Sequence, residues 1–328
     1  MAVRREGGVA MTDLMGKKNY YFALSILIFV ICAVGLYFNG LQLDIQFQGG
    51  TIVQIEMPDE NFDTELAADI VRETLGKTAT VNKSSTFNPE NAEENIYLMV
   101  LNVASEETLT DDERNTVIDA LRKEFNVAQD ASTRVISVEP TIGNEFRMNA
   151  LKAIAISSVL IVIYVWWRFR AMHGLSAGVF AVAALIHDII VMFTAYVILR
   201  IPINDSFIAA MLTIIGYSIN DTIVIYDRIR ENTKLMPKAN IRELVNKSVL
   251  QSLSRSINTS VTTLIAVLTL LVFSVIYNIQ SIREFTLPLV VGIISGVYST
   301  LFIASPLYMI WQERKLSRKA TARKPTKS

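Results

Sequence analysis

The sequence predicts a polytopic α-helical membrane protein with six transmembrane helices and one exported α+β domain. Of its 328 residues, 51% are hydrophobic and 19% are charged, and the mean hydropathy of +0.36 is too apolar for a soluble chain of this length. Residues 41–149 contain 21 of the 31 Asp and Glu residues but only 8 of the 31 Lys and Arg residues. This uneven distribution of charge separates a soluble domain from a membrane portion.

Six apolar runs are long enough to cross a membrane, because a hydrocarbon core about 30 Å thick takes about 20 helical residues. The runs cover roughly residues 20–38, 150–167, 174–198, 206–226, 256–277 and 285–310. The first run could instead be a signal peptide, since Arg4, Arg5, Lys17 and Lys18 precede it, but it is long and no small-x-small cleavage site ends it. We therefore expect an uncleaved first span.

The positions of Lys and Arg predict the orientation of the chain. Basic residues gather before the first span, between the second and third spans, in residues 227–255 and in the tail 311–328, whereas the alternate loops hold few. Because basic loops stay in the cytoplasm, we expect both termini, 1–19 and 311–328, to be cytoplasmic and residues 39–149 to be exported. Residues 150–310 then hold spans two to six, with 227–255 as an amphipathic cytoplasmic loop lying on the membrane surface.

The exported domain shows a regular order of elements. Residues 51–57 alternate as a strand does, 63–75 have helical spacing, two strand-like stretches follow, TLTDDERNTVIDALRKEF is a helix with Thr110 as its N-cap, and STRVISVEP is a last strand. The order β-α-β-β-α-β predicts a ferredoxin-like sandwich. Its acidic excess argues against nucleic acid as a partner.

Ionisable residues occur inside the predicted spans, where a charge costs about 3 kcal/mol and usually has a function. His187 and Asp188 lie near the middle of the third span, and Asp221 lies about six residues from the cytoplasmic end of the fourth. A carboxylate that is neutral in an apolar site and charged beside an arginine can carry a proton. For Asp188, interhelical hydrogen bonding without any transport is the competing interpretation.

The fifth span offers a partner for Asp221. Arg255, Asn258, Thr259 and Thr262 have i, i+3, i+4, i+7 spacing, which puts them on one helix face. An Asp221–Arg255 pair is geometrically reasonable if spans four and five are antiparallel neighbours. Arg255 would be a movable counter-charge, or the pair would be static and only fix helix packing.

Other kinds of site are not indicated. The single cysteine, Cys32, allows no intrachain disulfide and no thiolate cluster, and the sequence has no His-x-x-x-His pattern and no nucleophile motif. QFQGGT (46–51) lacks the Gly-Lys-Ser/Thr ending of a phosphate-binding loop and is better explained as a tight turn. We therefore expect no cofactor, no metal and no enzymatic activity, with a proton as the only coupling ion.

Three motifs resemble one family. GYSINDTIVIYDRIREN, LSRSINTSVTTL and ALIHD, together with six spans and one large exported domain after the first, resemble the SecF members of the SecD/SecF family of bacterial protein export. The resemblance covers nearly the whole chain. It implies half of a resistance-nodulation-division (RND) transporter fold, with SecD as the other half.

The resemblance also implies a function. SecD and SecF associate with the SecY-E-G channel in the bacterial cytoplasmic membrane and use the proton motive force to draw preproteins across. The motif carboxylate and arginine thought to serve the proton path match Asp221 and Arg255, while Asn220 and the polar residues Thr259 and Thr262 match neighbouring motif positions. Partners would be SecD, the channel, the preprotein and membrane lipids.

One motif departs from the family pattern, and two other functions remain open. The family commonly has Ile-Asp-Phe where this chain has Ile45-Gln46-Phe47, although Asp44 would share a strand face with Gln46. A proton-coupled exporter of small molecules or lipids is one alternative, but such exporters usually carry both six-helix halves in one chain. A non-transporting assembly factor is the other, and proton flux would distinguish it.

Overall fold

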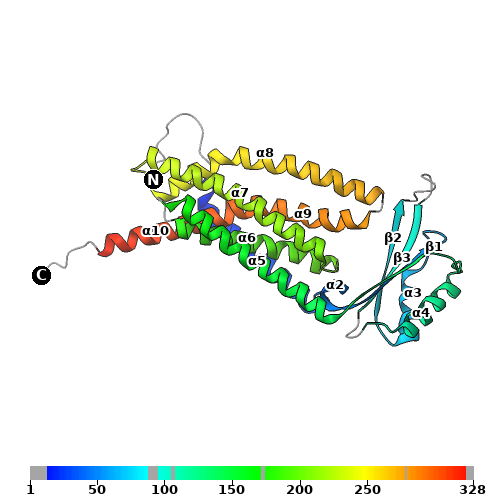
Figure 1. Cartoon of the computed structure of the whole chain (residues 1–328). Helices are drawn as coiled ribbons and strands as arrows, with labels where there is room; N and C mark the ends of the chain where they lie inside the picture. The colour runs from blue at the N-terminus through cyan, green and yellow to red at the C-terminus, as the bar shows by residue number, and fades with distance from the viewer. Residues whose placement is uncertain (1–12, 88–94, 105–107, 171–173, 278, 323–328) are drawn as a thin grey trace.

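The computed structural model describes residues 13–87, 95–104, 108–170, 174–277 and 279–322. A bundle of long helices forms one end of the molecule, and a small sheet with two helices forms the other (Figure 1). We call these two parts the helix bundle and the sheet domain.

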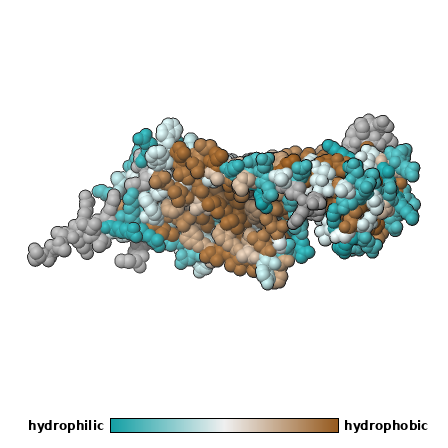
Figure 2. All heavy atoms as spheres, turned by 60° about the horizontal axis from the view of Figure 1, so that its bottom comes forward, coloured by the Kyte–Doolittle hydropathy of each residue, from teal (hydrophilic) through white to brown (hydrophobic). Residues whose placement is uncertain are grey.

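Six helical segments of the described residues are long and apolar enough to cross a membrane. α1 (Lys18–Asn39), preceded by the short turn η1 (Met15–Lys17), enters the sheet domain, and α5 (Pro140–Arg168) returns from it. The others are α6 (Gly174–Leu199), α7 (Asp205–Leu235), α8 (Ile241–Ile276) and a last segment made of α9 (Gln280–Ser299), the π-helical turn η3 (Thr300–Ala304) and α10 (Ser305–Ala322). Apolar residues cover the middle of the bundle in Figure 2. The predicted six-helix membrane fold is confirmed.

α7 and α9 pack closely because α9 carries glycine at the contact. A Cβ atom on Gly292 would lie 2.5 Å from Cγ1 of Ile214, and one on Gly296 would lie 3.2 Å from Oγ of Ser218. Side chains larger than hydrogen would therefore push the two helices apart. This close approach brings the hydroxyl groups of α9 to the carboxylate on α6 described below.

The sheet domain has the predicted ferredoxin-like arrangement. Its elements are β1 (Gly50–Met57), α3 (Thr64–Leu75), β2 (Ala79–Phe87), β3 (Asn95–Ala104), α4 (Asp111–Glu124) and β4 (Thr133–Val138). The strand order is β2-β3-β1-β4, and every neighbouring pair is antiparallel. The predicted order of strands and helices is therefore confirmed.

The core of the sheet domain follows from its sequence periodicity. Alternate β1 residues Val53 and Ile55 are fully buried, as are Val71 on α3 and Val117 on α4. Thr110 begins α4 with a reciprocal capping box, in which its hydroxyl accepts from the Glu113 amide and the Glu113 carboxylate accepts from the Thr110 amide. The predicted N-cap is confirmed.

Two local expectations were wrong. Residues 45–48 form a helical turn, α2 (Ile45–Gln48), instead of a strand, because the Asp44 carboxylate caps it by accepting from the Gln46 amide at 3.2 Å. Gly49 and Gly50 then adopt φ angles of 84° and 137°, which only glycine adopts without strain. Asp44 and Gln46 therefore do not share a strand face.

Residues 227–255 also differ from the expected helix on the membrane surface. α7 continues to Leu235 and α8 begins at Ile241, so the segment forms the ends of an antiparallel helix pair. Leu244, Val245 and Val249 belong to the buried core of the bundle. Their apolar spacing reflects packing within the core of the bundle and not adsorption to lipid.

Candidate functional site

Asp188 lies in the middle of α6 and joins three helices. Its side chain is 1% exposed. Its carboxylate accepts hydrogen bonds from Ser218 of α7 at 2.8 Å, from Ser295 of α9 at 2.6 Å and from Ser299 of α9 at 2.8 Å. Buried carboxylates need such donors, so this arrangement fits the interhelical hydrogen-bonding interpretation of Asp188.

His187 lies next to this carboxylate in an aromatic environment. Its ring stacks on Tyr298 at a centroid distance of 5.6 Å and lies 5.7 Å from the ring of Phe29. Both ring nitrogens are buried without a hydrogen bond in the described part of the chain, and Nδ1 is 3.5 Å from Oδ1 of Asp188. His187 therefore fixes the contact between α1, α6 and α9.

Asp221 lies at the α7–α8 contact, about one helical turn along α7 from Ser218. Ser256 of α8 donates to Oδ1 at 2.5 Å, whereas Oδ2 is buried and has no hydrogen-bond partner among the described residues. One turn away, the Tyr217 hydroxyl donates to Ser260 of α8 at 3.2 Å. Half of the Asp221 carboxylate is thus satisfied, and the other half is available to a proton or to a moving donor.

Arg255 lies close to Asp221 but does not pair with it. No nitrogen of Arg255 is within 4.0 Å of the Asp221 carboxylate, although Arg255 directly precedes Ser256, which binds that carboxylate. The side chain instead lines a cavity of about 530 Å³ between α7 and α8, at the end of the bundle away from the sheet domain. The expected pair is open in this structure.

The cavity gives water a route to the neighbourhood of Asp221. Its lining residues are Val224, Asp227, Arg228, Arg230, Glu231, Lys234, Gln251, Ser252 and Arg255. Asp227 binds Arg168 and Arg230, and Glu231 binds Arg228. Ser252 lies one helical turn before Ser256, so the cavity ends about one turn from the hydroxyl that binds Asp221.

The remaining predicted site residues point out of the helix bundle. Asn220, Thr259 and Thr262 are exposed. The two threonine hydroxyls donate to carbonyl groups of α8 itself, Thr259 to Arg255 and Thr262 to Asn258. The structure therefore places Asp221 of α7 and Arg255 of α8 near the contact between these two helices. It does not place Asn220, Thr259 or Thr262 around the carboxylate.

Sequence reasoning missed the serine donors on α8 and α9, Ser256 to Asp221 and Ser295 and Ser299 to Asp188. Ser252, Ser256 and Ser260 form a buried i, i+4, i+8 stripe on α8 that faces α7, and Ser295 and Ser299 form an i, i+4 pair on α9. Serines at four-residue spacing inside an apolar run are the signal that could have identified these donors. No three His, Cys, Asp or Glu residues within the described ranges form a cluster that could hold a metal ion.

Comparison with known proteins decides the family. Residues 117–314, more than half of the chain, match the family described as "Protein export membrane protein SecD/SecF, C-terminal". The chain belongs to the SecD/SecF family. It is 32% identical to the protein translocase subunit SecF of Anaerolinea thermophila over 92% of this chain and 94% of that protein, and 33% identical to SecF of Alicyclobacillus acidocaldarius over 94% and 95%.

Longer relatives named SecDF are similar as well. The chain is 34% identical to protein translocase subunit SecDF of Bacillus subtilis over 93% of its own length but only 39% of that protein. The crystal structure of SecDF from Thermus thermophilus, a translocon-associated membrane protein, matches with a TM-score of 0.75 at 31% identity over 93% of this chain and 39% of that chain. The chain thus corresponds to about two fifths of such a SecDF chain.

Proposed function

We propose that this chain is a SecF-type subunit that works with SecD at the SecY-E-G channel and uses the proton motive force to promote preprotein translocation. Relatives that are named protein translocase subunits and that match over nearly the whole chain support a role in protein translocation. The proposed location is the bacterial cytoplasmic membrane, with both termini in the cytoplasm and the sheet domain exported, because basic residues gather at the end of the bundle away from the sheet.

The observation that carries this proposal is the half-satisfied Asp221 carboxylate near a cationic cavity of about 530 Å³. Oδ1 is held by Ser256, Oδ2 has no partner in the described residues, and Arg255 lies in the cavity without closing an ion pair. Such a carboxylate can bind a proton when Arg255 is distant and release it when Arg255 approaches. Movement of α8 along α7 would therefore alternate the two states.

The energy available suits a repeated cycle. One proton crossing a potential of 100 mV supplies about 2.3 kcal/mol, which is less than the several kcal/mol that unfold a stable domain. A single proton can therefore bias the position of a helix or of the sheet domain but cannot unfold a preprotein in one step. Repeated small movements fit this magnitude.

The outer face of α8 supports SecD as the partner. Only 17% of the most apolar window of α8 is buried within the chain, and Asn258 on this face is exposed, as is Asn220 on α7. Exposed amide groups at membrane depth are unfavourable in lipid, so a second membrane protein is expected to cover them. The longer relatives are single chains named SecDF, a name that joins SecD and SecF.

The function is tested in inverted membrane vesicles that contain this chain, SecD and the channel. Translocation of a preprotein is measured with and without a proton gradient. We expect Asp221→Asn to abolish the gradient-dependent part while the variant still inserts and co-purifies with SecD, because asparagine keeps the shape and the Ser256 hydrogen bond but cannot carry a proton.

The matched control is Glu243→Gln, which removes an exposed carboxylate in the first turn of α8 that does not line the cavity. We expect this variant to retain gradient-dependent translocation. Full gradient dependence in Asp221→Asn vesicles would overturn the proposed mechanism.

A further inference from the structure

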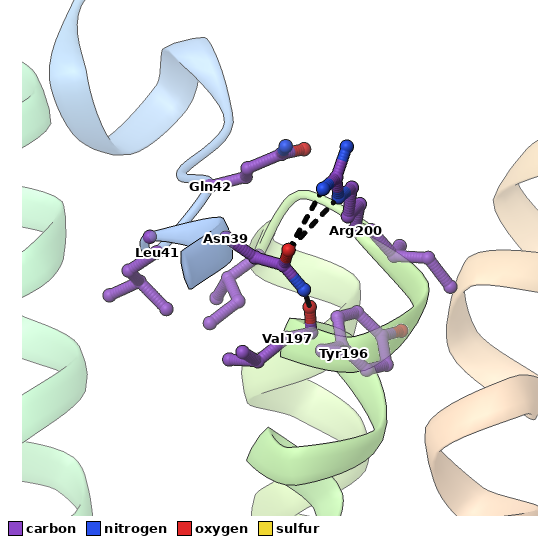
Figure 3. A pocket seen from close by; sticks show the side chains of 9 residues that line it. Asn39, Leu41, Gln42, Tyr196, Val197 and Arg200 are labelled. Atoms are coloured by element: carbon purple, nitrogen blue, oxygen red, sulfur yellow. Dashed lines mark hydrogen bonds between the residues drawn. The ribbon is translucent and has the colours of Figure 1, made fainter. Parts of the chain in front are cut away.

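We propose that Asn39 and Arg200 act as positioning residues that couple α7 to the sheet domain, through a clasp between the end of α1 and the loop between α6 and α7. The inference rests on the proposed proton-driven function and adds the route by which a movement at Asp221 reaches the sheet. The clasp consists of Asn39, Val197 and Arg200 (Figure 3), and it lies where α1 ends and the chain continues into the sheet domain.

The clasp uses every polar group of the Asn39 side chain. Oδ1 accepts from Nε of Arg200 at 3.2 Å and from Nη2 at 2.9 Å, and Nδ2 donates to the carbonyl oxygen of Val197 at 3.0 Å. Figure 3 shows the amide between the guanidinium group on one side and the end of α6 on the other. A two-point hydrogen bond from a planar guanidinium group fixes orientation as well as distance.

The backbone of Arg200 is shaped for this contact. Its φ angle is 54°, in the left-handed region that non-glycine residues seldom adopt. This turn ends α6 and directs the guanidinium group back to Asn39, while Gly40, with φ of 68°, turns the chain out of α1. The chain thus leaves α1 at Gly40 and α6 at Arg200 through residues with positive φ, and these two helix ends meet at the clasp.

A backbone bridge continues the clasp toward the sheet domain. Ile203 donates its amide to the carbonyl of Gln42 at 2.9 Å, and Asp44 donates its amide to the carbonyl of Ile203 at 2.9 Å. Leu43 and Ile203 form a parallel bridge, and Ile203 is buried. Residues 42–44 are therefore bridged to Ile203, in the loop that leads into α7.

Residues 42–44 lead through α2 into the sheet. Asp44 caps α2, and α2 packs so tightly on α5 that a Cβ atom on Gly143 would lie 3.0 Å from the carbonyl carbon of Phe47. β1 begins two residues after α2 and is a central strand of the sheet. A displacement of residues 42–44 is therefore passed to β1 through α2 and the Gly49–Gly50 turn, whose residues hold positive φ angles.

The bundle side of the clasp leads to the helices of the candidate site. Asn204, next to Ile203, caps α7 by accepting from the Phe207 amide at 3.0 Å and donates to Glu284 of α9. Asp221 lies 17 residues further along α7, or about 26 Å at 1.5 Å per residue. Because α7 is one continuous helix over this distance, a shift at Asp221 also moves its capped end.

The test measures proton flux and translocation in the same vesicles, which contain the full chain, SecD and the channel. Arg200→Gln and Asn39→Ala each break the clasp, Arg200→Lys keeps one charged donor, and Arg283→Gln is the matched control at the same end of the bundle. We expect the two disruptive variants to retain proton flux and to lose proton-driven translocation by at least about fivefold, the lower range for coupled sites. Arg200→Lys should recover part of it, and Arg283→Gln should equal the wild type.

Two results would overturn the coupling. One is wild-type translocation in both Arg200→Gln and Asn39→Ala vesicles. The other is a parallel fall of flux, translocation and thermal stability, which would make the clasp only a structural contact. Asp221→Asn vesicles measured alongside separate this failure from that of the proposed function, because their translocation depends on the proton site and not on the clasp.

Discussion

Replacing Asp188 by alanine removes the acceptor of three interhelical hydrogen bonds at once. The three donors are Ser218 on α7 and Ser295 and Ser299 on α9, at 2.6 to 2.8 Å, and all are buried. In Asp188→Ala the three hydroxyl groups lose their partner within a contact that glycine has already made close. We therefore expect this variant to be destabilised more than any single serine variant.

The magnitude follows from membrane-protein measurements. An interhelical hydrogen bond is worth about 0.6 kcal/mol on average and up to about 1.7 kcal/mol, so three correspond to roughly 2 to 5 kcal/mol. Ser295→Ala removes one donor, and about 0.6 to 1.7 kcal/mol is expected from it. Asp188→Asn keeps the size and one oxygen acceptor, so its loss should fall between those of the other two variants.

Reversible unfolding of the purified chain in mixed detergent micelles measures these differences. The order of stability should be wild type, Ser295→Ala, Asp188→Asn and Asp188→Ala, from highest to lowest. Equal unfolding free energies for wild type and Asp188→Ala would refute the reasoning that this carboxylate holds α6, α7 and α9 together.

Three further predictions concern other parts of the chain. Gly292→Ala places a Cβ atom 2.5 Å from the buried Ile214 and should cost about 1 to 3 kcal/mol in the same unfolding assay, whereas Gly216→Ala, with open space around it, should cost nothing. Thr110→Ala removes the capping box of α4 and should lower stability by about 1 kcal/mol, seen as earlier amide hydrogen exchange in the first turn of that helix; unchanged exchange would contradict it. Burial raises the pKa of the Asp44 carboxyl, the Gln46 amide opposes this, and nearby Asp205 adds to it. Because the folded-state pKa of Asp44 is above its unfolded value, this group's contribution to protein stability is fully present below the unfolded pKa and is lost as pH rises through the folded pKa. Asp44→Asn should therefore raise the thermal midpoint of unfolding more at about pH 7 than at about pH 4. Equal shifts at the two pH values would contradict this.

Patterns that are set locally could be predicted from the sequence. The apolar runs gave the six spans because a helix in a membrane must satisfy its backbone internally and present apolar side chains over a fixed length. The order of elements in the sheet domain and the Thr110 cap follow in the same way from periodicity and capping. Each of these signals depends on residues close together in the chain.

Features that depend on packing between helices could not be predicted. A helical wheel puts Ser218 and Asp221 on one face of α7. In the structure, however, Ser218 donates to Asp188 of α6 and Asp221 accepts from Ser256 of α8, because several helices pack around α7. The amphipathic pattern of residues 241–253 fits a membrane surface and a protein core equally well. Only the burial of Leu244 and Val245 in the core of the bundle decides between them.

The placement of Asp221 and Arg255 depends partly on local sequence and partly on packing between helices. The motif indicates the two residues, and the structure shows them on neighbouring helices, but their separation depends on where α8 lies along α7. The same sequence can form an open or a closed Asp221–Arg255 pair. The proposed proton cycle needs both the open and the closed state.

Proton flux in proteoliposomes tests the central claim, that Asp221 carries the proton while Asp188 holds the helices together. The chain is reconstituted with SecD, and a pH-sensitive dye inside the vesicles records flux after a potential is imposed. We expect flux to be lost in Asp221→Asn and retained in Asp188→Asn, whose amide still accepts from the surrounding serines. Retained flux in Asp221→Asn, or a loss found only in Asp188→Asn, would contradict the account.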